Sequence, residues 1–215
     1  MKIHIACGGT GGHVFPGLAT AKILKKRGHD VNLWLAGKNT EDLSIEGWDG
    51  PVVSIRAIGF PVKFSIRSLT GAARLFTAFL GCRKQMKNDL PDVLLAMGSY
   101  ASVGPALAAR SFSVPIVLHE ANAVPGRAIS MLSRFAAKTA VAFPAAAEYI
   151  KHSKVIVTGF PVRGDLSSHF DKSVLKPAAF TALVMGGSQG AHKLNEIAAG
   201  ALCALRAKGI PVQVV

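Results

Sequence analysis

Acidic residues, cysteines and long apolar runs are scarce in this sequence, and each shortage excludes a class of protein. Only 12 of its 215 residues are Asp or Glu, against 25 Lys and Arg, which gives a net charge of +13 and favours an anionic partner: nucleic acid, an acidic membrane surface or a phosphorylated substrate. The three cysteines, Cys7, Cys82 and Cys203, form no C-x-x-C pair and have no partner histidine spacing, which indicates a reduced, cytoplasmic protein. No stretch comes near the roughly 18 uncharged apolar residues that span a bilayer. The N-terminus runs straight into a strand-like segment, so we do not interpret it as a signal peptide.

Several motifs that carry known chemistry are also missing. The sequence has no Asp-x-Asp, the metal-chelating pair of one main class of nucleotide-sugar transferases, and no G-x-x-x-x-G-K-[S/T], which excludes a P-loop nucleotidase. Its first glycine run is not G-x-G-x-x-G, and Ala36, Gly37 and Lys38 stand where an acidic residue would hold a ribose, which disfavours a nicotinamide oxidoreductase. The histidines also lack zinc-ligand spacing.

Short runs of Val, Ile and Leu alternate with helical patterns along almost the whole chain. Continuous apolar runs are typical of parallel strands covered on both faces. With helices between them they form βαβ units, so the sequence predicts an α/β fold with an open, doubly wound sheet. Strands are expected at residues 2–7, 30–35, 52–55, 93–97, 115–119, 139–142, 155–158, 180–185 and 211–215.

Two glycine loops indicate two Rossmann-like domains. Gly8 to His13 follows the first strand, and Gly186 to His192 follows the strand at 180–185; each pattern is strand, glycine loop, helix. We place the first domain at 1–163, a linker at 164–177 and the start of the second domain at 178–215. The last part supplies one strand, one helix and the start of another strand, which is too little to bury a core. We therefore expect the sequence to stop inside its second domain.

The first glycine loop is the strongest candidate site. Glycine lets the backbone approach a ligand closely, and a helix predicted from Phe15 or Pro16 to Lys26 points its N–H groups and positive dipole end at the loop. His13 lies at the mouth of this loop, where a base can meet a substrate. A turn that only saves space is the less favoured interpretation.

Polar residues also follow two later strands. Tyr100 and Ser102, in the loop at 97–105, could bond sugar or phosphate oxygens, or could belong to an ordinary turn with a packed tyrosine. His119 and Glu120 could form an acid/base pair. We prefer to assign Asn122 to ligand contact and Glu120 to holding the loop.

Two further loops suit phosphate. Arg163 follows the turn at 159–162 and can reach a phosphate as a planar fork. The third glycine loop places Ser188 and the backbone N–H groups of Gln189, Gly190 and the next residue at a helix N-terminus, which suits a diphosphate.

The segment from Phe60 to Lys87 is basic and partly apolar. We expect a helix there whose apolar stripe faces the core and whose basic face is solvated; the stripe is Ile66, Leu69, Ala73, Phe76 and Leu80, and the basic residues are Lys63, Arg67, Arg74, Arg83, Lys84 and Lys87. Its lead-in, with Phe60, Phe64 and Ile66, is harder to bury and would suit contact with an anionic membrane.

Five motifs in this order resemble the MurG family of lipid-linked N-acetylglucosaminyltransferases, which have the GT-B architecture of two Rossmann-like domains. The motifs are GGTGGHVFPGLA at 8–19, MGSYAS at 97–102, VLHEAN at 117–122, GFPVR at 159–163 and GGSQGA at 186–191. The sequence departs from the family pattern at Phe160, where Asn is usual, at Ala121, where Gln is usual, and at Val103, which separates Ser102 from the following Gly-Pro.

The resemblance implies inverting transfer of N-acetylglucosamine from UDP-GlcNAc to the C4 hydroxyl of the muramyl sugar of lipid I, which gives lipid II for peptidoglycan synthesis. It implies no bound metal and no cofactor. His13 would be the general base, kept neutral by its place at a helix N-terminus. The implied contacts to the UDP-sugar are Thr10, Gly11, Gly12, Asn122, Arg163 and Ser188, and the loops that would face the lipid diphosphate contain Tyr100, Ser102, Glu120, Gln189 and Gly190.

The resemblance also implies a peripheral protein on the cytoplasmic face of the bacterial inner membrane, with other cell-wall synthesis proteins as further partners. We expect the 215 residues alone not to turn over, because the uracil- and ribose-binding part of the family's second domain is missing. The alternatives are another GT-B enzyme, such as a diacylglycerol glycosyltransferase or a UDP-GlcNAc 2-epimerase, a nucleic-acid-binding module, which no motif supports, and a scaffold for wall enzymes.

Overall fold

The chain forms two compact units, Met1–Gly164 and Asp165–Val215, which are described separately. A computed structural model describes residues 1–37, 45, 47–55, 66–162, 180–186 and 191–214, with the backbone alone at 66–74 and 214. No helix of these residues is long and apolar enough to cross a membrane.

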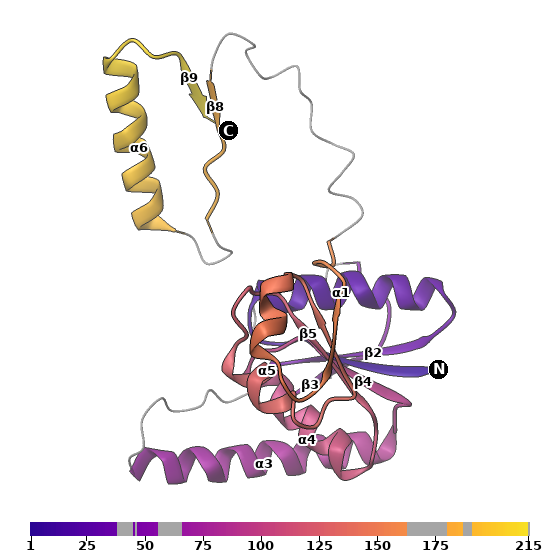
Figure 1. Cartoon of the computed structure of the whole chain (residues 1–215). Coiled ribbons are helices and arrows are strands. Elements are labelled where there is room, and N and C mark those ends of the chain that lie inside the picture. Colours follow the sequence, from indigo (N-terminus) through magenta and orange to yellow (C-terminus); the bar gives the residue numbers. More distant parts are fainter. Residues whose placement is uncertain (38–44, 46, 56–65, 163–179, 187–190, 215) are drawn as a thin grey trace. The chain divides into compact units, whose positions relative to one another are not determined.

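The first unit is built on a seven-stranded parallel sheet with the order β3-β2-β1-β4-β5-β6-β7 (Figure 1). The order reverses between β1 and β4, and the carboxyl ends of strands at such a switch point are where open α/β sheets bind ligands. Its strands are β1 (Lys2–Ala6), β2 (Asp30–Leu35), β3 (Val52–Ser54), β4 (Val93–Ala96), β5 (Ile116–Glu120), β6 (Lys138–Val141) and β7 (Lys154–Val157). Its helices are α1 (Gly11–Lys26), α3 (Ile66–Asn88), α4 (Val103–Ser111) and α5 (Arg127–Leu132), with 3-10 turns η1 (Tyr100–Ser102) and η2 (Pro144–Tyr149).

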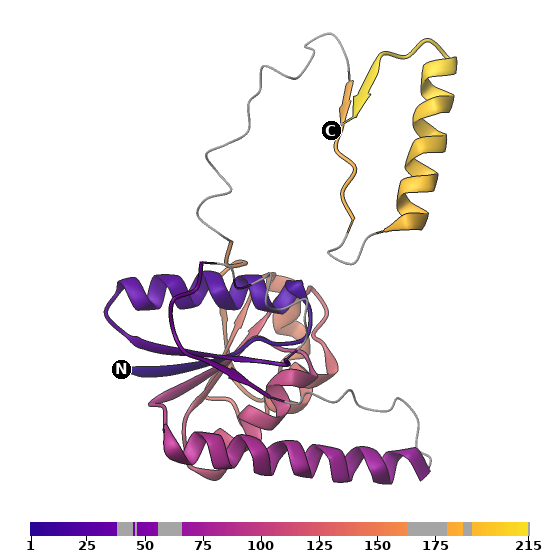
Figure 2. The same ribbon diagram turned by 180° about the vertical axis from the view of Figure 1, so that it is seen from behind.

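The two faces of this sheet carry separate apolar layers. In both views α1 and α3 lie on opposite sides of the sheet (Figures 1 and 2). The layer under α1 includes Val14 and Leu18, and the opposite layer joins Trp34 of β2 to Met86 of α3. Since the central strands β1, β2, β4 and β5 are covered on both faces, they read as the continuous apolar runs from which they were predicted.

The predicted start of α1 is wrong. Proline favours the first turn of a helix, which is why Pro16 was expected to open this one. The structure starts the helix at Gly11, after an extended Thr10 with φ −141° and ψ 161°, so Pro16 lies inside it and cannot donate to the Gly12 carbonyl. His13 therefore belongs to the first helical turn instead of a loop before it.

The predicted apolar stripe of α3 is wrong where the structure tests it. Phe76 and Leu80 are 60% and 47% exposed. The helix packs on the core through a second set of apolar residues, also at helical spacing: Leu75, Phe79, Cys82 and Met86. The side chains of Ile66, Leu69 and Ala73 lie outside the described part of the chain.

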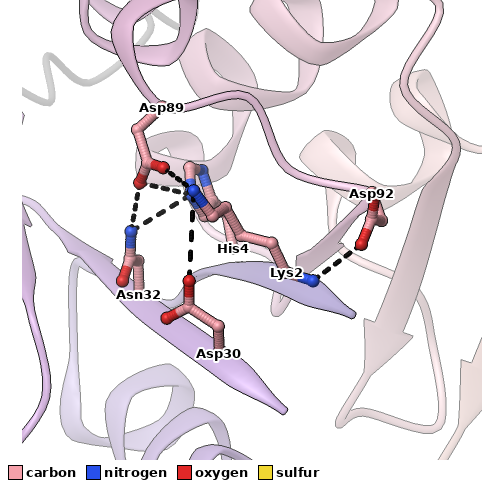
Figure 3. Close-up of polar contacts among 6 residues, drawn as sticks. All are labelled: Lys2, His4, Asp30, Asn32, Asp89 and Asp92. Carbon is pink, nitrogen blue, oxygen red and sulfur yellow. Dashed lines mark hydrogen bonds and ion pairs between the residues drawn. The ribbon is translucent and has the colours of Figure 1, made fainter.

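A polar network fixes the amino-terminal edge of the sheet to the end of α3 (Figure 3). Asp89, directly after the helix, accepts from the ammonium of Lys2 and the amide of Asn32, and lies 3.2 Å from Nε2 of His4. The backbone N–H of Lys2 donates to Asp92 at 2.7 Å. The network lies at the edge opposite to the glycine loops, and it positions β1 and β2 against α3.

The described part of the second unit, residues 180–186 and 191–214, forms a βαβ motif. Its strands β8 (Phe180–Ala182) and β9 (Val212–Val214) pair in parallel, and α6 (His192–Ala207) connects them without a buried side chain. This is the strand, helix and further strand that the sequence predicts for this stretch.

Candidate active site at the carboxyl edge of the sheet

Three loops meet where β1, β4 and β5 end, because these strands are neighbours in the sheet. They contribute the turn before α1, the turn at Gly98 and Ser99, and the loop after Glu120. The first two interlock closely: a Cβ added at Gly9 would lie 2.4 Å from the Ser99 hydroxyl oxygen. Gly9 has φ +121°, so both its conformation and its surroundings require glycine.

His13 is half-buried between these loops. Its Nδ1 lies 3.0 Å from Oγ1 of Thr10. The other side of its ring packs over Gly98, where an added Cβ would come within 3.3 Å of Cδ2 and 3.4 Å of Nε2. Thr10 and Gly98 thus hold the imidazole from two sides.

The surroundings of His13 favour its neutral form. Burial lowers the pKa of this imidazole, and the nearby His119 lowers it further, while the negative charge of Glu120 opposes both. The sequence predicts a neutral His13 from its place at a helix N-terminus; in the structure, burial is the largest cause that lowers its pKa. A neutral imidazole can accept a proton, which is the chemistry that a general base requires.

Glu120 holds the loop that follows it, as the sequence analysis prefers. This carboxylate is 3% exposed and accepts three hydrogen bonds at 2.8 Å, from the backbone N–H and side-chain amide of Asn122 and from the N–H of Gly126. Asn122 is itself exposed, with its amide nitrogen turned towards Glu120. Glu120 therefore supports Asn122 and the loop that follows.

Ser102 is also a support and not a contact group in this structure. It is fully buried, and its hydroxyl lies 3.0 Å from the Ala6 carbonyl and close to the Gly98 carbonyl. The expectation that it meets substrate is therefore corrected: it ties the loop after β4 to the end of β1. Tyr100 is partly buried against the core.

His119 connects β5 to the turn after β7, a role that the sequence analysis missed. Its Nε2 lies 3.4 Å from the Gly159 carbonyl, and its ring meets Phe160 edge to face with centroids 6.2 Å apart. Burial lowers the pKa of this imidazole, and the Gly159 carbonyl and Glu120 raise it. The connection spans β6, where Ala140 is the register partner of His119. Only the strand order could have revealed it.

The remaining predicted site residues are only partly described. Thr10 and Gly12 are exposed and Gly11 is partly exposed at the start of α1. Among the described residues no group of three or more His, Cys, Asp or Glu side chains is arranged to hold a metal ion. Arg163, Ser188, Gln189, Gly190, Phe60, Phe64 and the side chain of Ile66 lie outside the described residues.

Residues 3–141 match the glycosyltransferase family 28 N-terminal domain. The chain belongs to this family. The match runs from β1 to β6 and includes all three loops around His13.

Individual relatives agree with this assignment. The family 28 chain is 39% identical over 199 residues to a Photobacterium profundum protein named UDP-N-acetylglucosamine–N-acetylmuramyl-(pentapeptide) pyrophosphoryl-undecaprenol N-acetylglucosamine transferase, covering 91% of this chain and 54% of the relative. It is similar to the crystal structure of Acinetobacter baumannii MurG, with TM-score 0.73 and 27% identity over 100% of this chain and 67% of that one. The chain therefore spans about half the length of its curated relatives.

The same fold occurs with other activities. The UDP-GlcNAc 2-epimerase of Neisseria meningitidis, solved with UDP-GlcNAc bound, has TM-score 0.62 but only 13% identity, over 100% of this chain and 66% of that one. At that identity the likeness shows the fold alone, so it does not favour the epimerase alternative.

Proposed function

We propose that the protein containing this chain transfers N-acetylglucosamine from UDP-GlcNAc to the C4 hydroxyl of the muramyl sugar of lipid I, with inversion. The observation that carries this proposal is the 39% identity, over nearly the whole chain, to a transferase named for that reaction. The arrangement around His13 supports it, because the loops after β1, β4 and β5 surround a half-buried, neutral imidazole beside the start of a helix.

His13 acts in this proposal as the general base. It takes the proton of the acceptor hydroxyl as the oxygen attacks the anomeric carbon, and the bond from that carbon to the UDP oxygen breaks. The N–H groups at the start of α1 face the side on which negative charge develops. Transfer proceeds without a bound metal; the absence of an Asp-x-Asp pair from the sequence supports this part of the proposal.

The donor and acceptor contacts follow the family resemblance. We assign Thr10, Gly11, Gly12, Asn122, Arg163 and Ser188 to the UDP-sugar, and Tyr100, Gln189 and Gly190 to the loops that face diphosphate. The exposure of Thr10, Gly12 and Asn122 is compatible with such contacts.

The proposal includes peripheral attachment to the cytoplasmic face of the inner membrane, since its acceptor is an anionic lipid. The exposed Phe76 and Leu80 of α3 support it, because they lie on the same helix as the exposed cations Lys84 and Lys87. Exposed apolar side chains among cations are typical of surfaces that adsorb to anionic lipid. We add Phe76 and Leu80 to the sequence-based candidates Phe60, Phe64 and Ile66.

Release of UDP from UDP-GlcNAc tests the reaction. The intact protein should release UDP only when a lipid I analogue is present, and His13→Gln should reduce the rate at least about a hundredfold. Release that requires a diacylglycerol or another acceptor in place of lipid I would overturn the acceptor assignment. If UDP is released when no acceptor is present, and the sugar formed is 2-epimerised, the result would favour the epimerase.

Two non-enzymatic alternatives have their own tests. Tight duplex binding that persists at high salt would favour a nucleic-acid module, whereas weak and strongly salt-dependent binding would dismiss it. Full biological activity of a His13→Ala variant would favour the scaffold.

A further inference from the structure

The side-chain hydroxyl of Thr10 does not make the capping hydrogen bond that is usual at its position. Thr10 is the N-cap residue of α1, where a threonine oxygen usually accepts a backbone N–H of the first turn. Here no side-chain cap bond forms, and the N–H groups of His13 and Val14 donate to the Thr10 carbonyl at 2.9 and 3.0 Å. The hydroxyl instead lies 3.0 Å from Nδ1 of His13.

The role of this contact depends on which ring nitrogen of His13 carries the proton. If the hydroxyl donates to Nδ1, then the neutral ring carries its proton on Nε2 and has no free lone pair for a substrate. If Nδ1–H donates to the hydroxyl, Nε2 is left as the acceptor. Nε2 is the nitrogen on the Gly98 side of the ring, towards the loop after β4.

We propose that Thr10 is a positioning residue that accepts a hydrogen bond from Nδ1–H of His13 and so holds Nε2 unprotonated as the proton acceptor. The inference rests on the proposed function and assigns Thr10 a role beyond contact with the donor sugar. In it, the Nδ1 proton stays on the ring while Nε2 takes the proton of the attacking hydroxyl.

The carboxylate of Glu120 and the Nε2 of His119 bond to partners other than His13. Both carboxylate oxygens of Glu120 accept from the loop at Asn122 and Gly126. His119 directs its Nε2 to the Gly159 carbonyl. Thr10 therefore takes the place that a carboxylate holds in many histidine-base enzymes. Because a hydroxyl is neutral, it orients the ring without raising its pKa as a carboxylate would.

Nitrogen-15 NMR of histidine-labelled protein tests the tautomer directly, at a pH above 8, well above the lowered pKa of His13. The signal of His13, one of seven histidines, is identified by its loss in His13→Gln. We expect a protonated Nδ1 and an unprotonated Nε2 in the wild type, and the same pattern in Thr10→Ser. In Thr10→Val, which keeps the shape but removes the hydroxyl, the proton should move largely to Nε2. A wild-type ring protonated on Nε2, or no change in Thr10→Val, would overturn the proposal. The signal of buried His4 shows whether the variants remain folded.

Kinetics of the intact protein then separate positioning from donor contact. Thr10→Val should lower kcat by about tenfold or more, in addition to any rise in KM for UDP-GlcNAc from the lost donor contact, and Thr10→Ser should recover most of the loss in kcat. A raised KM at unchanged kcat would make Thr10 a donor contact only. If the wild type transfers nothing, the proposed function fails, whereas the NMR result still decides the tautomer.

Discussion

At the scale of single residues, the site depends on glycines that let His13 lie against the loop after β4. Gly98 has φ +89°, and an added Cβ would press on the imidazole at 3.3 Å. We therefore expect Gly98→Ala to displace His13 and to abolish most transfer, because the methyl group takes the space of the ring. Steady-state kinetics of the intact protein would measure the loss.

Gly28 provides the matched control for this prediction. It has φ +82° and no atom within 4 Å of an added Cβ. Gly28→Ala and Gly98→Ala therefore share a backbone cost of about 1 kcal/mol, but only Gly98→Ala crowds the site. Equal activity of the two variants, at equal loss of stability in urea, would contradict the packing of His13 on Gly98.

Glu120 offers a second prediction at this scale. The substitution Glu120→Gln keeps the size of the side chain but replaces one acceptor oxygen with an NH2 group. This group cannot accept a hydrogen bond, so its own N–H faces the N–H donor that the carboxylate oxygen bound. We expect the free energy of unfolding to fall by about 2–3 kcal/mol, since buried hydrogen bonds to a charged group are lost. Urea unfolding measures this, and Asn122→Ala, which removes a single exposed partner, should cost less. An unchanged midpoint for Glu120→Gln would show that the carboxylate does not hold the loop.

At the scale of elements, α3 has two apolar faces, one packed on the core and one exposed. Phe79 packs on the core, whereas Phe76 and Leu80 are exposed. We expect Phe76→Ser with Leu80→Ser to weaken binding to anionic vesicles at least about fivefold, because each exposed apolar side chain contributes on insertion. The free energy of unfolding should change by less than about 1 kcal/mol.

Phe79→Ser is the control on the same helix. It should destabilise the fold, because it removes apolar contacts from the core. Its effect on vesicle binding, measured below its unfolding midpoint, should be small. If Phe79→Ser loses vesicle binding while Phe76→Ser with Leu80→Ser keeps it, α3 does not insert through its exposed face.

The same helix shows where prediction from sequence ends. Strands were predicted well because parallel strands buried on both faces are continuous apolar runs, as in β1 and β5. The face of α3 was not, because the sets Leu75, Phe79 and Phe76, Leu80 both have helical spacing and only packing against α4 chooses between them. The start of α1 failed in the same way, since local preference at Pro16 was overridden by the fold.

Contacts between distant segments were beyond sequence reasoning for another reason. The glycine loops can be recognised locally, so the region around His13 was predicted before any strand order was known. The contact of His119 with Gly159 requires β5, β6 and β7 to be neighbours. The inward turn of Ser102 likewise depends on β1 lying beside β4.

At the scale of the whole first unit, buried histidines couple its stability to pH. Burial is the largest cause that lowers the pKa of His4, His13 and His119 from the ordinary value of 6.5. As the pH falls, these three histidines therefore take up protons at a higher pH in the unfolded chain than in the folded chain. Unfolding binds protons to these histidines below about pH 6.5, so their contribution makes stability decrease with falling pH in that range and is constant above it.

Asp89 makes the stability depend on pH in a second, more acidic range. The ammonium of Lys2 is the main cause that lowers the pKa of this carboxyl below its ordinary value of 3.8, so its contribution is present above that pH and is lost only below it. The two ranges can be separated by experiment, because histidine protonation on unfolding begins near pH 6.5 and aspartate protonation near pH 4.

His4 gives the test of this coupling. His4→Gln keeps a donor for Asp89 but removes the titrating ring, so the slope of the unfolding free energy against pH should become shallower between pH 6.5 and 5. The region below pH 4 should keep most of its slope, because Lys2, the main cause of the lowered Asp89 pKa, is unchanged. His152→Gln removes an exposed histidine from the same unit and serves as the matched control. A slope that His4→Gln and His152→Gln reduce equally would show that burial of His4 is not its cause. If only His4→Gln reduces the slope, the loss of stability in acid is assigned to the edge of the sheet opposite the proposed site. This pH dependence can then vary without a change in the proposed base, His13.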